Sequence, residues 1–167
     1  MSPILHWKRL ARDFGGLVIL LLALEVRAEH YEINLTVEAG DQKVEGRVDD
    51  YPPAGGRYPR PVLRGKAGQP LTLQFFMTDV NPHEIMKNVT VRFYIVAQES
   101  VGQKEPPALK EGIVLQGKYT LDFKPQAKVG LRQIFRVPKP GAYLVRVQSE
   151  NSGSDHEHFA AVDLKIE

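Results

Sequence analysis

Histidine and methionine side chains at two places in the chain could bind a metal ion. His156 and His158 flank Glu157, and because alternate residues of a strand point to the same side, the two imidazoles would share one face. His83 and Met86 stand three residues apart in a predicted loop. Imidazole with thioether is a ligand set that suits copper. The sequence therefore offers His83, Met86, His156 and His158 as candidate copper ligands, if the fold brings the two places together.

The same histidines allow two other interpretations. They can be local polar structure at the entry to a strand, where imidazoles commonly form hydrogen bonds with nearby groups or face water. Alternatively, His83 or His158 could act as the general base of a hydrolase, with a carboxylate of Glu84, Asp155 or Glu157 beside it. That chemistry requires the base to lie within hydrogen-bond distance of its proton donor.

Recognisable catalytic signatures are absent from the sequence, which favours a binding protein over an enzyme. There is no G-x-S-x-G motif and no phosphate-binding glycine-rich loop. His83-Glu84-Ile-Met-Lys87 begins like the H-E-x-x-H motif of zinc proteases, but Lys87 replaces the second histidine. The chain has no cysteine, which excludes disulfides, thiolate metal sites and cysteine nucleophiles. We predict no catalytic residues.

Charge and hydropathy divide the chain near residue 28. Residues 29–167 hold 18 basic and 18 acidic residues, which argues against binding nucleic acid. Lys8, Arg9 and Arg12 precede an apolar run over 15–24, and Ala28 follows with the small side chain that a signal peptidase accepts. The run is shorter than the ~20 residues that span a bilayer as a helix. We predict a signal peptide over 1–28 and export to the periplasm or the extracellular space, with a retained membrane anchor as the alternative.

Apolar residues alternate with polar ones through most of the remaining chain, which is typical of strands in antiparallel sheets. Leu71, Leu73, Phe75 and Met77 illustrate the pattern. We predict an N-terminal hairpin over 29–48, a Pro/Gly linker over 49–61 and a β-sandwich over 62–167. About eight strands with regular turns predict an all-β, antiparallel immunoglobulin-like sandwich.

Pro140-Gly141-Ala142-Tyr143 is similar to the corner before strand F of immunoglobulin-like domains, where a tyrosine hydroxyl binds backbone. On this corner and the strand rhythm, residues 68–167 weakly resemble the exported YtkA-like domains. That resemblance implies an accessory or binding role at the cell envelope.

If 71–77 is strand B, 89–95 strand C, 143–147 strand F and 160–166 strand G, the B–C and F–G loops lie at the same end of the domain. The four candidate copper ligands would then meet there. The protein's partner is expected to be another envelope or extracellular protein. Phe76, Tyr94 and Val96 could form an exposed apolar patch for it, or could be covered by the N-terminal hairpin.

Overall fold

The computed structural model describes residues 30–46, 60–151 and 157–167. These residues form nine strands: β1 (Tyr31–Ala39), β2 (Gln42–Gly46), β3 (Val62–Gly65), β4 (Pro70–Asp79), β5 (Met86–Gln98), β6 (Ile113–Phe123), β7 (Lys128–Arg136), β8 (Gly141–Glu150) and β9 (Phe159–Ile166). Within these ranges the structure has no helix that is long and apolar enough to cross a membrane. The predicted signal peptide over 1–28 lies outside the described residues.

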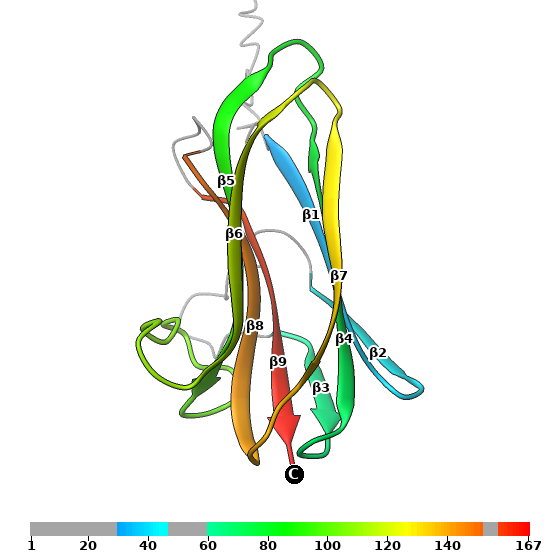
Figure 1. The fold of residues 1–167 in the computed structure, drawn as a ribbon, viewed down its shortest axis with the longest axis vertical. Coiled ribbons are helices and arrows are strands. Elements are labelled where there is room, and N and C mark those ends of the chain that lie inside the picture. The colour runs from blue at the N-terminus through cyan, green and yellow to red at the C-terminus, as the bar shows by residue number, and fades with distance from the viewer. Residues whose placement is uncertain (1–29, 47–59, 152–156) are drawn as a thin grey trace, which may run out of the picture.

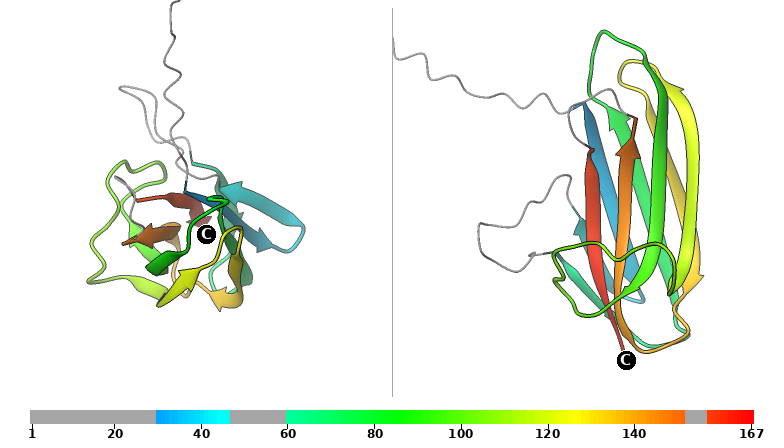
Figure 2. Two further views of the ribbon diagram at one scale, coloured as in Figure 1. Left: turned by 90° about the horizontal axis from the view of Figure 1, so that it is seen from above. Right: turned by 90° about the vertical axis from the view of Figure 1, so that its left-hand side faces the viewer.

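The strands form two sheets that face each other (Figures 1 and 2). The first sheet has the order β2-β1-β4-β7 and the second β3-β9-β8-β5-β6. All neighbours are antiparallel except β3 and β9, which are parallel. β4, β5, β8 and β9 occupy the positions of strands B, C, F and G of an immunoglobulin-like domain. The fold is therefore the predicted all-β immunoglobulin-like sandwich.

Alternate residues of the strands fill the space between the sheets. On β4, the side chains of Leu71, Leu73, Phe75 and Met77 are at most 1% exposed, while the residues between them are half-buried. Burying a large apolar side chain contributes ~1.5–3 kcal/mol, so this row must face the core. On β4, the alternation that predicted the strand also predicted which side of it is inside.

The predicted tyrosine corner is present before β8. The Tyr143 hydroxyl donates a hydrogen bond to the Lys139 carbonyl oxygen at 2.8 Å. Gly141, between them, has φ of +146°, which an L side chain rarely adopts. The glycine and the hydroxyl together determine how the chain turns from β7 into β8.

The predicted N-terminal hairpin exists, but its first strand is part of the sandwich. β1 pairs with β4 from Tyr31 opposite Asp79 to Glu38 opposite Thr72, and its inward side chains are buried in the same core. The sandwich therefore does not begin at residue 62. The apolar face of β1 needs a second sheet to cover it. Pairing with the edge of β4 brings this face into the core between the two sheets. Most of the predicted linker over 49–61 lies outside the described residues, because residues 47–59 are not among them.

The structure corrects the predicted apolar patch of Phe76, Tyr94 and Val96. Phe76 lies on β4 in one sheet, whereas Tyr94 and Val96 lie on β5 in the other, so the three side chains do not share a surface. Tyr94 and Val96 are at most 4% exposed, in a second apolar cluster with Leu144, Phe159 and Ala161. Leu109, from the loop 99–112, packs on this cluster. That loop, rather than the N-terminal hairpin, covers them.

Candidate functional site

The four predicted copper ligands have different environments. His83 is exposed in the β4–β5 loop, where its backbone N–H donates to the Asn81 side chain at 3.0 Å. Met86 is half-buried at the start of β5, opposite Phe123. His158 is fully buried just before β9, and its N–H donates to Ser149 Oγ at 3.0 Å. His156 lies outside the described residues.

His158 lies beside two residues that the sequence analysis did not select. Its ring centroid is 6.3 Å from that of His30 and 5.9 Å from that of Tyr31. His30 immediately precedes β1, and Tyr31 is opposite Asp79 in the β1–β4 pairing. A polar cluster of three buried residues, Tyr31, Asp79 and His158, and the half-buried His30 therefore lies at the end of the sandwich where β1 begins and β4 ends. Here it is called the end cluster.

Asp79 is the residue of the end cluster that the sequence could have revealed. It continues the inward row of Leu71, Leu73, Phe75 and Met77, a position where a carboxylate is unusual. Its side chain is 0% exposed. Oδ1 accepts a hydrogen bond from the Asn81 N–H at 2.8 Å, and Oδ2 has no hydrogen-bond partner among the described residues.

Burial raises the pKa values of two residues of the end cluster. The pKa of Asp79 is raised by burial, while the hydrogen bond from Asn81 and the charge of His30 act in the opposite direction. Burial also raises the pKa of Tyr31, and the negative charge of Asp79 adds to this effect. Among the described residues, no three His, Asp or Glu side chains converge as metal ligands. The end cluster is therefore a largely buried group of titratable side chains in which two imidazoles lie close together.

A buried ion pair anchors the loop 99–112 to the outer face of the second sheet. Arg60 Nε lies 2.7 Å from Asp163 Oδ1, and both side chains are at most 3% exposed. The other oxygen of Asp163 accepts a hydrogen bond from the Gly102 N–H at 2.6 Å, and Arg60 Nη2 donates to the Gln103 carbonyl at 2.7 Å. Gln98 Nε2 also donates to Asp163 Oδ1, at 3.0 Å. The loop is thus held at a fixed place above β5 and β9.

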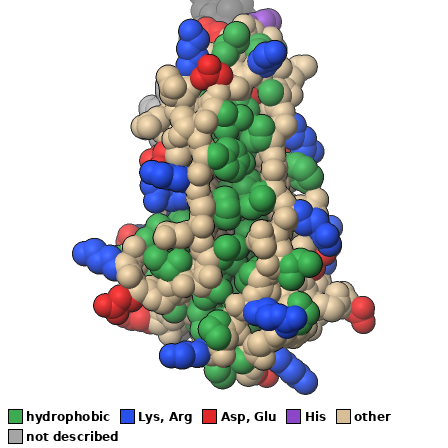
Figure 3. All heavy atoms as spheres, viewed as in Figure 1, with side chains coloured by type: hydrophobic (Ala, Val, Ile, Leu, Met, Phe, Trp, Pro, Cys, Tyr) green, Lys and Arg blue, Asp and Glu red, His purple; other side chains and the backbone are tan. Residues whose placement is uncertain are grey.

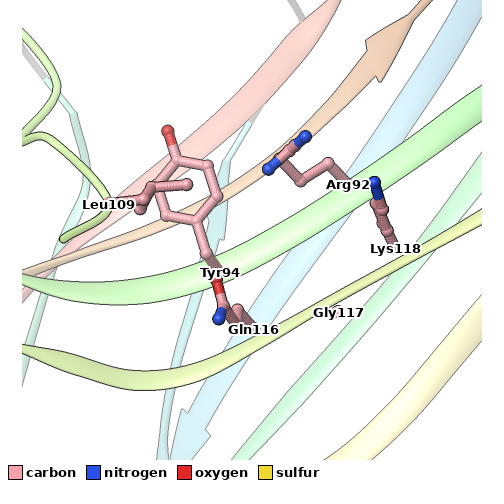
Figure 4. Close-up of a pocket in the computed structure, with 6 residues that line it drawn as sticks. All are labelled: Arg92, Tyr94, Leu109, Gln116, Gly117 and Lys118. Atoms are coloured by element: carbon pink, nitrogen blue, oxygen red, sulfur yellow. The ribbon is translucent and has the colours of Figure 1, made fainter.

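A pocket of about 260 Å³ opens where this loop meets β5 and β6 (Figure 4). It is lined by Arg92, Tyr94, Leu109, Gln116, Gly117 and Lys118. Leu109 and Tyr94 form an apolar wall, and the two cations stand on the other side. The pocket is placed by pairing across the sheet, where Arg92 lies opposite Lys118 and Tyr94 opposite Gln116.

The electrostatics of this pocket favour a negatively charged group. Arg92 forms an ion pair with Glu150 of β8, and its Nη2 lies 3.1 Å from Glu150 Oε2. Lys118 is exposed and has no carboxylate partner among the described residues. Burial raises the pKa of Tyr94, and the positive charges of Arg146, Arg92 and Arg60 oppose this rise. The pocket therefore combines an uncompensated cation with a protonated phenol and an apolar wall.

No protein-family model matches the chain, and no curated protein matches it. Among solved structures, the chain is similar to the C-terminal domain of wzt, with a TM-score of 0.44, 8% identity, and coverage of 83% of this chain and 74% of that one. It is similar to the CARDB domain of the PF1109 protein from Pyrococcus furiosus, with a TM-score of 0.44, 10% identity, and coverage of 83% and 96%. It is also similar to the PmoD soluble domain from Methylocystis sp. ATCC 49242 (Rockwell), with a TM-score of 0.42, 14% identity, and coverage of 81% and 90%. The resemblance to YtkA-like domains is not confirmed by these comparisons.

Proposed function

We propose that the chain is an exported, non-enzymatic immunoglobulin-like accessory domain that binds another protein of the cell envelope. The basic and apolar pattern of residues 1–28 supports export. The weak resemblance of residues 68–167 to exported YtkA-like domains agrees with an accessory role. The surface we assign to binding is the outer face of β5 and β6 around the pocket of Figure 4.

The observation that carries this proposal is the charge of Lys118 beside an apolar wall. A partner carboxylate would pair with Lys118, and an adjoining aliphatic group would pack on Leu109. Such a centre, with an anchor in a small pocket and a polar rim, is the arrangement that dominates binding energy in protein interfaces. The Arg60–Asp163 ion pair keeps Leu109 in place before the partner arrives, which lowers the ordering cost of binding.

Photo-crosslinking in the producing cell tests this function directly. A photoreactive residue replaces Gln116 at the pocket, and a matched one replaces Lys139, which is exposed at the corner before β8. We expect one protein to be crosslinked from position 116 and not from 139. Lys118→Glu should abolish that adduct, and Lys66→Glu should leave it. Equal adducts from both positions, or an adduct insensitive to Lys118→Glu, would refute binding at this face.

We propose copper binding at the end cluster as a second candidate function, favoured by the 6.3 Å between the ring centroids of His30 and His158. With nitrogen–metal bonds of ~2 Å, one ion between two imidazoles requires ring centroids about this far apart. His83, Met86 and His156, predicted from the sequence, are the candidates for the remaining ligands. Competition with a Cu(I)-specific chelator measures the affinity. His30→Ala should weaken it at least tenfold, and His83→Ala should do so if the β4–β5 loop contributes.

A further inference from the structure

The sandwich is open along one side, between β6 and β7. Each of these strands is the last strand of its sheet and is paired on one side only. They are consecutive in the chain, joined by residues 124–127, yet they lie in different sheets and share no strand pairing. In an immunoglobulin-like domain of the constant type, strand D pairs with strand E. β7 occupies the position of strand E, and no described strand occupies the position of D.

Apolar side chains of the core reach the surface along this opening. Figure 3 shows them as a stripe that follows the long axis between β6 and β7. The residues of these two strands and their turn that pack on the core while only partly buried are Val114, Leu115, Tyr119, Leu121, Ala127, Val129 and Leu131. An apolar stripe that reaches the surface is a candidate interaction site.

A glycine on β6 leaves room for an aromatic ring at the opening. Gly117 is opposite Phe93 of β5, and a Cβ on Gly117 would lie only 2.4 Å from Phe93 Cζ. The Phe93 ring therefore occupies the space of the missing side chain and stays partly exposed. Nearby on β6, the Tyr119 hydroxyl is buried without a hydrogen-bond partner among the described residues. The wall of the opening thus includes a partly exposed aromatic ring.

The free edge of β7 presents two different rows of side chains. Val129, Leu131 and Phe135 face the core. Lys128, Arg132 and Arg136 are exposed, and the Lys128 ammonium lies 4.2 Å from the Phe76 ring centroid on the outer side of the first sheet. β7 contains no acidic residue. The inward row also holds Gln133, and the outward row also holds Gly130 and the exposed Ile134. A strand added to this edge would place alternate residues beside a mainly apolar row and beside a row that carries three cations.

We infer that the β6–β7 opening accepts an extended segment of a partner protein, in which apolar residues alternate with Asp or Glu. The segment pairs with β7 as an added strand, places its apolar side chains in the stripe and its carboxylates beside Lys128 and Arg132. Main-chain hydrogen bonds to the edge supply affinity, and the two rows supply specificity. A second copy of the chain is a poor occupant because two β7 edges would bring like charges together. This inference rests on the proposed protein-binding function and adds a surface separate from the Lys118 pocket.

A peptide titration tests the inference without knowledge of the natural partner. The probe has nine residues, the length of β7, with Val or Leu alternating with Glu, and its matched control has Lys in place of Glu. In ¹⁵N-resolved NMR spectra of the chain, we expect the Glu peptide to shift the signals of β6 and β7 and to protect β7 amides from hydrogen exchange. The Lys peptide should bind at least tenfold more weakly.

Charge reversal on β7 provides the matched variant. Lys128→Glu combined with Arg132→Glu changes only exposed side chains, so the domain should fold, and its peptide preference should reverse from Glu to Lys. Lys118→Glu, at the pocket, should leave peptide binding unchanged. Equal affinity for both peptides, no binding, or a dimer through this edge in sedimentation experiments would overturn the inference. A crosslink from position 116 that persists in the β7 variant would keep the proposed function intact in each of those cases.

Discussion

Arg60 and Asp163, separated by 103 positions in the sequence, form an ion pair that is almost fully withdrawn from water. This pair joins Arg60, two residues before β3, to the middle of β9. Through Gly102 and Gln103 it also fixes the loop that covers Tyr94 and Val96. The candidate binding pocket therefore depends on a contact far from it in the chain.

Arg60→Met should destabilise the domain by about 3–5 kcal/mol, because it leaves the Asp163 carboxylate buried without its cation. Urea denaturation measures this loss, and hydrogen exchange should show faster opening of residues 99–112. Arg64→Met is the control, since the Arg64–Glu167 pair is 3.8 Å long and well exposed. Its effect should stay below about 1 kcal/mol. Equal effects of the two variants would contradict a structural role for the buried pair.

Two tyrosines should respond oppositely to removal of the hydroxyl. Tyr119→Phe should stabilise the domain by about 1 kcal/mol, because the hydroxyl is buried without a partner among the described residues. Tyr143→Phe should destabilise it by a similar amount, because it removes the 2.8 Å hydrogen bond to Lys139. Denaturation midpoints of both variants against the wild type check the signs. A loss of stability in Tyr119→Phe would mean that the hydroxyl is satisfied in solution.

Stability should fall at alkaline pH because of Tyr119. Burial raises the pKa of this tyrosine from 10.0 to about 12. The folded state therefore keeps the phenol proton more tightly than the unfolded state does, and the resulting stability is complete below pH 10 and lost as the pH rises toward 12. Denaturation midpoints between pH 8 and 11.5 measure the loss. In Tyr119→Phe the decline should be shallower, and an identical decline would assign it to other groups.

Asp79→Asn should stabilise the domain at pH 7 and have little effect at pH 3. Burial raises the pKa of Asp79 in the folded state. The protonated carboxyl therefore contributes its full stability to the folded state below the ordinary Asp pKa of 3.8. This contribution is lost as the pH rises through the pKa of Asp79 in the folded state. Asp41→Asn, at an exposed turn, is the control and should change neither midpoint. Destabilisation by Asp79→Asn at pH 7 would show that the end cluster needs the ionised carboxylate, for example beside His30.

The sequence alone predicted most of the strands and the side of each that faces the core. Leu71, Leu73, Phe75 and Met77 alternate with polar residues, and a period of two admits only one buried side in a sheet. The corner at Pro140, Gly141 and Tyr143 could also be predicted from the sequence, because the turn at Gly141 and the hydrogen bond of the Tyr143 hydroxyl involve residues close together in the chain. It also selected β4, β5, β8 and β9 as strands B, C, F and G.

The tertiary structure decided what depends on contacts between distant residues. The pairing of β1 with β4, the burial of Tyr94 and Val96 under the loop 99–112, and the closeness of His30 to His158 follow from how strands far apart in the chain are arranged. Local alternation is the same whether a strand lies at an edge or within a sheet, so the sequence did not reveal that β6 and β7 are edges. The opening between β6 and β7 and the pocket depend on where packing puts these two edge strands and the loop 99–112. No local sequence pattern encodes those positions.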